Sequence, residues 1–363
     1  MDKNEKILII GSGHWQVSGI KKLVTDGYKR LYVIDTRTDC LQKIGKIKKL
    51  HLQSLNLKNI LSLVKRLKIQ NCLSFSSEFT LLLMNQVKKE LKKNYLDQVI
   101  INKVLKKSNF RLFQKANGFN HPNFFHKYSK IVNYKNYKNY FLKPNMNSDS
   151  RGIIKLTKKL KFENYKTLIN KVKKNSFDKK IILEKMIDGK EYGGNCYFSE
   201  NKIYYLSITN KIIKNNIVVG HVFPSNLKSS TKKQIESELK SLLKSLKIKN
   251  SIINFDFKIN KNKIYFLELS PRNGGNGLTE IIKLKSSIDF EKMFYKKKQF
   301  IKSVDNFYYC SFIIRAQKSG KIKFLKKNKT KNFVKKLIFF KKKVIMSKLA
   351  QKKFLKLVWL FSK

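Results

Sequence analysis

The sequence predicts a mixed α/β and α+β protein with an open α/β domain first, antiparallel hairpins further along and a small C-terminal segment of strands and helices. The first observation is a continuous apolar run at 7–10, followed by Gly11, Gly13 and Gly19, which is typical of a buried parallel strand leading into a helix. The second is a series of period-2 stretches further along, which indicate antiparallel hairpins. With 363 residues, of which 42% are hydrophobic, the chain is long enough for two or three packed domains.

The N-terminal part alternates between strands and helices. A second strand is predicted at 31–35, and the pattern repeats with a helix near 57–67, a strand at 72–75 and a helix at 80–91. The third glycine is misplaced for the GxGxxG fingerprint of dinucleotide-binding domains, so we expect a mononucleotide-type βαβ unit. Residues 1–105 are therefore predicted to form a Rossmann-like α/β domain.

Two further segments predict strands joined by polar loops. Residues 141–156 suit a strand, a loop of Asn, Ser and Gly, and a second strand, with Lys143 inside the apolar first strand. A lysine in that position needs an anionic partner. The loop offers backbone N–H groups and the guanidinium of Arg151 to a phosphate, although an exposed hairpin turn explains it equally well. Residues 181–198 suit a strand, a turn and another strand that carries Glu191.

The most informative stretch, 252–269, predicts two strands joined by a tight polar turn, each with one apolar face. If Asn260 pairs with Ile264 across a three-residue loop, the same register sets Asp256 opposite Glu268. Opposed carboxylates destabilise a sheet unless a cation lies between them, and a hard divalent ion such as Mg²⁺ suits that role. Two solvated acids on an ordinary exposed hairpin are the alternative.

The residues after this hairpin extend the same candidate site. Ser270 falls on the face of Glu268 and is a candidate for a weaker oxygen ligand. Arg272 follows, and then Gly274 and Gly275, whose backbone can approach an anion closely.

The formal net charge of +58 raises the question of a nucleic-acid partner. The excess is almost entirely lysine, spread through the chain and enriched together with Asn, Ile and Phe. Arginine, which dedicated readers of bases and phosphates favour, is rare. We therefore expect compositional drift and no specific nucleic-acid partner, with weak nonspecific binding to polyanions at low salt.

Cysteine usage and hydropathy bear on the compartment. The four cysteines show no CxxC spacing and fit reduced, packed thiols better than disulfides or a zinc site. No stretch of about 18 uncharged apolar residues occurs. We therefore expect a cytoplasmic protein.

Taken together, these segments resemble the ATP-grasp superfamily, which includes the large subunit of carbamoyl phosphate synthetase, biotin carboxylase and the ATP-dependent carboxylases and ligases of purine synthesis. The resemblance runs from Lys107 to Asp289 and more loosely from the N-terminus. It implies a pre-ATP-grasp domain followed by a two-subdomain ATP-grasp fold and a C-terminal element. The implied limits are 1–105, 106–298 with a flap subdomain at about 125–187, and 299–363.

The resemblance also implies roles for individual residues. Lys107 and Lys143 match the two nucleotide-binding lysines, and Arg272 matches the catalytic arginine of the E-x-N-P-R motif. The other residues expected to hold ATP are the flap residues Ser150, Arg151 and Gly152, the adenine segment Glu184, Lys185, Met186 and Ile187, and Glu191 at the ribose. The metal-binding acids, for Mg²⁺ or Mn²⁺, are Asp256 and Glu268. The family's usual Asn after the second acid is Ser270 here, which predicts a weaker metal contact or its replacement by water.

The activity that the resemblance implies is that of an ATP-dependent carboxylate–amine ligase. ATP phosphorylates a small carboxylate, and an amine or similar nucleophile displaces the phosphate. Phosphoryl transfer needs positioning and charge neutralisation, which lysines, an arginine and carboxylate-held Mg²⁺ provide. The expected partners are small carboxylate and amine substrates. The alternative is a noncatalytic nucleotide- or polyanion-binding protein that retains the fold.

Two residues and the C-terminal tail complete the predictions. His221 and Lys211 are candidate substrate contacts, with a packed or loop histidine as the alternative for His221. The tail at 335–363 is basic and amphipathic. Packing of the tail against the ATP-grasp core is favoured over a peripheral membrane contact, and homodimerisation through it is equally open.

Overall fold

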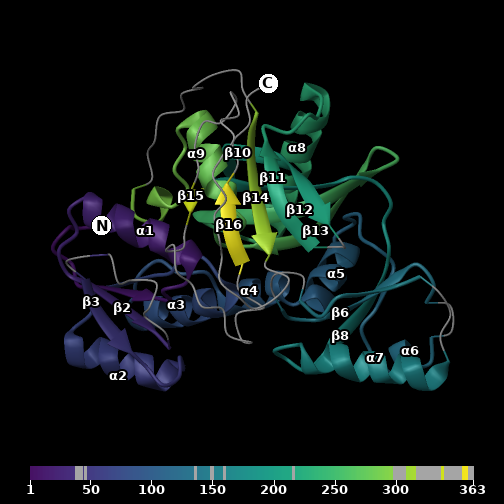
Figure 1. The fold of residues 1–363 in the computed structure, drawn as a ribbon, viewed down its shortest axis with the longest axis horizontal. Coiled ribbons are helices and arrows are strands. Elements are labelled where there is room, and N and C mark those ends of the chain that lie inside the picture. Colours follow the sequence, from purple (N-terminus) through teal and green to yellow (C-terminus); the bar gives the residue numbers. More distant parts are fainter. Residues whose placement is uncertain are drawn as a thin grey trace, which may run out of the picture. The chain divides into compact units, whose positions relative to one another are not determined.

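The chain in the computed structural model divides into two compact units, and Figure 1 labels its helices and strands. Unit 1 comprises Met1–Tyr95, Leu206–Leu227 and Arg272–Lys363, and unit 2 comprises Leu96–Tyr205 and Lys228–Pro271. The residues described are 1–36, 44, 47–134, 137–147, 151–157, 161–214, 217–296, 308–315, 337–338 and 354–358. The units group residues by packing, so segments far apart in the sequence share a unit. The domain limits expected from the sequence follow chain order and stay a prediction.

Unit 1 begins with a four-stranded parallel sheet in the order β3-β2-β1-β4. Its strands are β1 (Ile7–Ile10), β2 (Leu31–Asp35), β3 (Ile47–His51) and β4 (Asn71–Leu73), and its helices are α1 (His14–Thr25), α2 (Leu57–Leu67) and α3 (Glu78–Glu90). All four residues of β1 are buried because the strand lies between β2 and β4, and the side chains of Ile7 and Ile9 join the core with those of α1. The predicted Rossmann-like α/β architecture is confirmed.

The glycines after β1 have separate structural reasons. Gly11 has a φ of +96°, which L-residues with a side chain rarely adopt. A Cβ on Gly19 would lie 2.5 Å from Cγ of Phe75, so this glycine lets α1 pack closely against that ring. The turn is also bound to the end of β2, because Asp35 accepts hydrogen bonds from the Ser12 backbone N–H at 2.6 Å and its hydroxyl at 2.9 Å. The third glycine, Gly19, which does not fit the GxGxxG spacing, is thus explained by the close packing of α1 against Phe75.

The rest of unit 1 contains antiparallel strands and a helix. β11 (Ile217–Phe223) pairs with β10 (Lys202–Lys214), whose residues from Leu206 onward belong to this unit, and with β14 (Tyr309–Arg315). The remaining elements are α9 (Leu278–Ser286), the 3₁₀ turn η2 (Lys292–Phe294), β15 (Leu337–Ile338) and β16 (Phe354–Val358). β16 pairs with both β14 and β15. Most of the basic tail at 335–363 lies outside the described residues.

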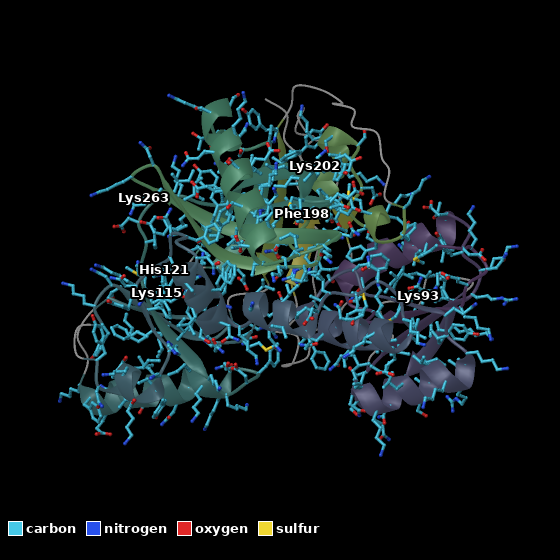
Figure 2. All side chains as sticks on the ribbon, turned by 180° about the vertical axis from the view of Figure 1, so that it is seen from behind. Lys93, Lys115, His121, Phe198, Lys202 and Lys263 are labelled. Carbon is cyan, nitrogen blue, oxygen red and sulfur yellow. The ribbon has the colours of Figure 1, made fainter. Side chains whose placement is uncertain are left out.

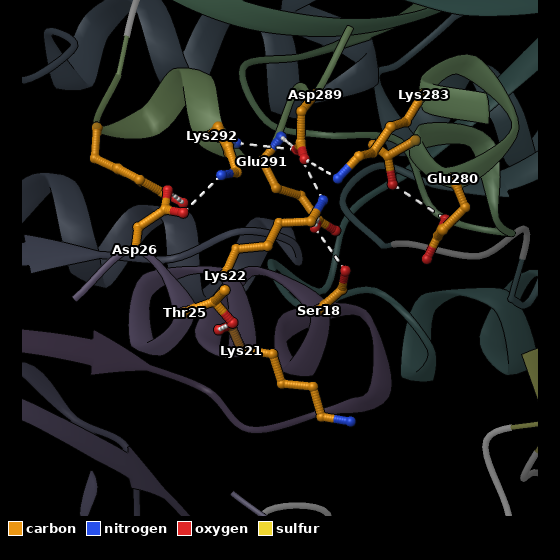
Figure 3. A network of polar contacts seen from close by, with 12 residues as sticks. Ser18, Lys21, Lys22, Thr25, Asp26, Glu280, Lys283, Asp289, Glu291 and Lys292 are labelled. Atoms are coloured by element: carbon orange, nitrogen blue, oxygen red, sulfur yellow. Dashed lines mark hydrogen bonds and ion pairs between the residues drawn. The ribbon is translucent and has the colours of Figure 1, made fainter. Parts of the chain in front are cut away.

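A network of ion pairs joins the segment after α9 to α1 (Figure 3). Nζ of Lys22 lies 2.7 Å from Oδ1 of Asp289 and 2.6 Å from Oε2 of Glu291. Nζ of Lys283 binds the other oxygen of Asp289 at 2.7 Å. Burial alone would lower the pKa of Lys22, but the two carboxylates outweigh it and raise that pKa. The network therefore fixes residues 287–296 on α1 through charge.

Replacing Asp289 with asparagine should lower the free energy of unfolding by about 3 kcal/mol. Removing one partner of a buried pair costs about 3–5 kcal/mol, and we expect the lower end because Lys22 retains Glu291. The measurement is urea unfolding of the full chain. The matched control is Asp26→Asn, which breaks the more exposed pair with Lys292 and should cost about 1 kcal/mol or less. Equal losses in the two variants would contradict a dominant role for Asp289.

Unit 2 holds two antiparallel strand assemblies. The first has the order β13-β12-β9, formed by β9 (Glu191–Ser199), β12 (Ser251–Asn260) and β13 (Lys263–Ser270). The second has the order β5-β8-β6-β7, formed by β5 (Phe124–Phe125), β6 (Tyr140–Pro144), β7 (Ile154–Leu156) and β8 (Ile181–Lys185). The helices are α4 (Gln98–Leu105), α5 (Lys107–Ala116), α6 (Tyr128–Val132), α7 (Phe162–Lys174) and α8 (Ser229–Ser245). The predicted mixture of α/β and α+β architecture is confirmed.

The hairpin of β12 and β13 corrects one step of the sequence argument. The loop has two residues, Lys261 and Asn262, both with positive φ, and Asn260 pairs with Lys263. The predicted three-residue loop is wrong. The pairing register also shifts between Asp256 and Phe257, because β13 has one extra residue there, Leu267. This β-bulge offsets the shorter loop, so the predicted pairing of Asp256 with Glu268 is confirmed.

Lysine side chains extend from elements of both units (Figure 2), for example Lys93 of unit 1 and Lys115 and Lys263 of unit 2. Among the described residues, the lysines are therefore not confined to one unit, and the compositional origin of the charge stays a prediction. Among the described helices, none combines the length and the apolar character needed to cross a bilayer.

Candidate active site

A polar face crosses the three strands β9, β12 and β13. Its central row places Asp256 between Gly193 and Glu268. The row on one side contains Asn195, Asn254 and Ser270, and the row on the other contains Glu191, Lys258 and Tyr265. Because side chains alternate along a strand, the polar members of the three rows on β12 share one face of the sheet. The sequence pattern had separated this face from the apolar one but had not shown which strand lies beside it.

One of the paired acids, Glu268, is in contact with a lysine of the protein. Nζ of Lys107, the first residue of α5, lies 3.5 Å from Oε1 of Glu268 and 3.5 Å from the carbonyl oxygen of Asn147. The side chain of Glu268 is 39% exposed, so its carboxylate can still be reached by a ligand. The structure thus brings together the first predicted nucleotide lysine and the second predicted metal ligand.

The donor set of this face suits a hard metal ion. Two carboxylates, a hydroxyl and an amide oxygen are the ligands that Mg²⁺ and Mn²⁺ accept. Over the part of the chain that the structure describes, no three His, Cys, Asp or Glu side chains gather as a metal cluster. A metal held by Asp256 and Glu268 therefore needs further oxygens from other residue types or from phosphate.

A buried charged centre lies on the second sheet. Oε1 of Glu184 lies 3.0 Å from Nε of Arg111, and its Oε2 lies 2.6 Å from Nζ of Lys143. Burial alone would raise the pKa of Glu184, but Arg111 and Lys143 outweigh it and lower that pKa to about 2. The predicted anionic partner of Lys143 is confirmed and is Glu184, which lies in the segment expected to hold adenine.

Arg111 connects this centre to the hairpin. Its Nη2 donates to the carbonyl of Leu267 at 2.7 Å and its Nη1 to that of Phe266 at 3.3 Å. A β-bulge disrupts the ladder locally, and here Arg111 binds the carbonyl of the extra residue directly before Glu268. Sequence reasoning gave Arg111 no role. The signal was an arginine within the apolar rows of a predicted helix.

The loop after β6 is bound at its two ends. Asn147 donates through Nδ2 to the carbonyl oxygens of Asn175 at 2.6 Å and of Arg151 at 3.3 Å. Gly152 has a φ of +76°, and a Cβ there would lie 2.8 Å from Cβ of Asn175. Ser150 lies outside the described residues, so its predicted phosphate contact stays a prediction with those of Arg151 and Gly152.

The predicted adenine segment, residues 184–187, begins in β8 and continues beyond it. Several of its backbone groups form hydrogen bonds within the protein. The N–H of Lys185 donates to the carbonyl of Asn123, and the N–H of Met186 donates to that of Asn139, both at 2.8 Å. The carbonyl of Ile187 accepts from Nζ of Lys258 at 2.9 Å.

Lys258 was missed by sequence reasoning, although it shares the period-2 face of Asp256. It lies opposite Glu191, the predicted ribose ligand. Burial lowers the pKa of Lys258, and Glu191 partly opposes that effect.

The predicted catalytic arginine belongs to unit 1. Arg272 binds Glu78 through Nε at 3.0 Å and through Nη2, and its Nη1 donates to the Asn273 carbonyl at 2.6 Å. A Cβ on Gly275 would lie 3.9 Å from Nε1 of Trp15. Gly274 precedes Gly275 in the sequence, so both predicted glycines lie within three residues of Arg272.

His221 is buried in β11, as the packed-histidine alternative expected. Its Nδ1 lies 3.0 Å from Oγ1 of Thr209, and its register partners are Lys211 and Ser311. Burial, followed by the charge of Lys211, lowers the pKa of His221 to about 3. The imidazole is therefore neutral at physiological pH, and substrate contacts of His221 and Lys211 stay predictions.

The packing thus divides the predicted site residues into two groups. The described nucleotide and metal candidates all belong to unit 2, and Arg272 with the substrate candidates belongs to unit 1.

Comparison with known proteins agrees with this fold. A model of the ATP-grasp domain matches residues 137–280, the part of the chain that contains Lys143, Glu184, Asp256 and Glu268. This match agrees with the resemblance to the ATP-grasp superfamily that the sequence motifs predicted. A search of curated proteins by sequence finds no match.

Several solved structures share the fold. An L-amino acid ligase from Bacillus licheniformis is 15% identical with a TM-score of 0.80, covering 100% of this chain and 95% of that one. Phosphoribosylglycinamide synthetase from Anaerococcus prevotii is 18% identical with a TM-score of 0.70, covering 99% and 95%. The biotin carboxylase domain of 2-oxoglutarate carboxylase from Hydrogenobacter thermophilus, solved with MgADP and bicarbonate, is 14% identical with a TM-score of 0.78, covering 98% and 86%. At these identities the likeness concerns the fold.

Proposed function

We propose that this protein is an ATP-dependent carboxylate–amine ligase that uses Mg²⁺ or Mn²⁺. The observation that carries the proposal is the pairing of Asp256 with Glu268 on a polar face that also receives Lys107. The MgADP bound by a biotin carboxylase domain of the same fold supports the choice of nucleotide and ion. The chemistry is formation of an acyl phosphate on a small carboxylate, followed by attack of an amine or a similar nucleophile.

In this proposal the residues of unit 2 bind and orient the nucleotide. Asp256 and Glu268 hold the metal ion, and Lys107 and Lys143 bind phosphate oxygens. Glu184 keeps Lys143 in one place within an apolar strand. The metal ion, when bound, neutralises phosphate charge, which is the main requirement of phosphoryl transfer.

The residues of unit 1 are assigned to the acceptor substrates. Arg272 is the candidate for stabilising charge that develops during transfer, because a guanidinium presents several donors to an oxyanion. Gly274 and Gly275 offer close backbone approach, and Lys211 offers a positive charge beside the neutral imidazole of His221. Donors of these kinds suit a small anionic carboxylate.

The proposal is tested by the shift in melting temperature with ATP, measured with and without Mg²⁺. A ligand present at 100 times its dissociation constant adds about 2.7 kcal/mol of stability. We expect a magnesium-dependent shift in the wild-type protein that is much reduced in Glu268→Gln. The matched control is Glu236→Gln, an exposed acid of α8 in the same unit, which should behave as wild type.

A positive result leads to a screen of carboxylate and amine pairs by ADP release. No shift with ATP, together with a shift from nucleic acid that disappears in salt, would overturn the ligase proposal. That result would support a noncatalytic polyanion-binding protein.

A further inference from the structure

Four oxygen-bearing side chains form a rectangle on the β12–β13 hairpin. Asp256 pairs with Glu268, and Asn254 pairs with Ser270 in the next row on the same face. Cβ atoms of directly paired residues lie about 4.5–5.5 Å apart, and neighbours on one face of a strand lie about 7 Å apart. The side chains of Asn254 and Ser270 therefore border the predicted metal position on one side.

The amide of Asn254 has a defined orientation. Its Nδ2 donates to the carbonyl oxygen of Gly194 at 2.9 Å and to Oδ1 of Asn195 at 3.1 Å. A backbone carbonyl can only accept, so the atom that faces Gly194 must be the nitrogen. Both protons of Nδ2 have acceptors within bonding distance, and Oδ1 is consequently turned away from β9.

The oxygen of this amide is available to a ligand. Within the described chain, the hydrogen bonds of the Asn254 side chain are the two made by Nδ2. The side chain is half-buried rather than enclosed, so Oδ1 can be approached. It is a neutral acceptor held in one orientation beside two carboxylates.

Ser270 is less suited to the same task. Its oxygen is one bond from Cβ, whereas the oxygen of an asparagine is two bonds away. The residue is also 2% exposed. An asparagine on either member of this pair would extend an amide oxygen further from the sheet than a serine does.

We infer that Asn254 supplies the amide oxygen ligand of the metal ion held by Asp256 and Glu268, in place of an asparagine at position 270. The inference rests on the proposed function, because it concerns the same metal site. Two carboxylates and one neutral oxygen leave the remaining octahedral positions to phosphate oxygens and water, as Mg²⁺ prefers.

The test is Mn²⁺ binding to the full chain with ADP present, measured from the electron paramagnetic resonance signal of free Mn²⁺. Asn254→Ser should weaken Mn²⁺ binding by at least about tenfold, the size of effect seen even for outer-sphere partners of metal ligands. Adding Ser270→Asn exchanges the two residues across the pair and should restore wild-type affinity. Asn120→Ser is the matched control, because the Asn120 amide also donates to a carbonyl of the hairpin, that of Ile264; it should bind Mn²⁺ as wild type.

A structural role of Asn254 gives a different pattern. Loss of its Nδ2 hydrogen bonds would lower the melting temperature without ligands, and an asparagine on β13 would not replace those bonds. Wild-type Mn²⁺ affinity in Asn254→Ser, or no recovery in the exchanged double variant, would overturn the inference. Glu268→Gln separates the two proposals: if it abolishes Mn²⁺ binding while Asn254→Ser does not, only the role of Asn254 fails. If the wild-type protein with ADP binds no Mn²⁺, the proposed function fails as well.

Discussion

Replacing Glu184 with glutamine should lower the free energy of unfolding by about 3–5 kcal/mol, the cost of leaving buried charges without their partner. The carboxylate contacts Nε of Arg111 at 3.0 Å and Nζ of Lys143 at 2.6 Å, and the Arg111 and Glu184 side chains are each 1% exposed. A neutral amide has no charge to offset the two cations, and its nitrogen cannot accept from the second of them. The measurement is urea unfolding of the full chain near neutral pH.

The same substitution should also weaken nucleotide binding, because Lys143 would lose the group that holds it in place. The matched control is Glu163→Gln, an exposed acid in the first turn of α7 in the same unit, which should change stability by about 0.5 kcal/mol or less. A loss in Glu184→Gln no larger than in this control would show that the buried centre contributes little.

The charged centre also predicts a dependence of stability on pH. The pKa of Glu184 is about 2 in the folded protein, below its ordinary value of 4.5. A depressed pKa means that its ionisation favours the folded state above the ordinary value and that this contribution is lost as the pH falls toward the folded pKa. The stability difference between wild type and Glu184→Gln should therefore shrink as the pH is lowered from about 5 toward 2. A difference that stays constant over this range would contradict the assignment.

Replacing Arg272 with lysine should lower the rate of ADP release with the accepted carboxylate and amine by about 100- to 1,000-fold. That is the usual effect of losing one preorganised donor to a developing negative charge. Lysine keeps the charge opposite Glu78 but lacks the planar fork of donors. The magnesium-dependent melting shift with ATP should be retained, because the proposed nucleotide and metal residues lie in unit 2.

The control for this second prediction is Arg66→Lys, an exposed arginine of α2 in unit 1, which should keep wild-type turnover. Unchanged turnover in Arg272→Lys would remove the catalytic role proposed for that residue. Loss of the ATP melting shift together with turnover would indicate a role in binding instead.

The sequence was sufficient for predictions that depend on neighbours along the chain. The apolar run of β1, the glycine turn and the alternation in β12 follow from local periodicity, and each forms the predicted element. The pairing of Asp256 with Glu268 was also predicted, although through a loop one residue too long. A loop residue and a bulge residue shift the register equally, so the pattern alone could not distinguish them.

The lysine within β6 shows how far such reasoning extends. The position of Lys143 within an apolar strand predicted an anionic partner, and Glu184 is that partner. Which anion it is depends on the antiparallel pairing of β6 with β8, which brings Lys143 and Glu184 together from positions 41 residues apart. The third member, Arg111, comes from a helix, and no local pattern connects it to either strand.

The sequence by itself therefore determined the buried first strand, the glycine turn after it and the two opposed acids, because periodicity and turn chemistry act over a few residues. Only the tertiary structure decided that Arg111 binds the bulge beside Glu268, that Lys258 faces Glu191 and that Asn254 turns its oxygen away from β9. These contacts depend on strand order, a bulge and burial, which arise when distant segments pack. The physical reason is that a side chain's electrostatic partners are set by neighbours in space, and the sequence states only its neighbours in the chain.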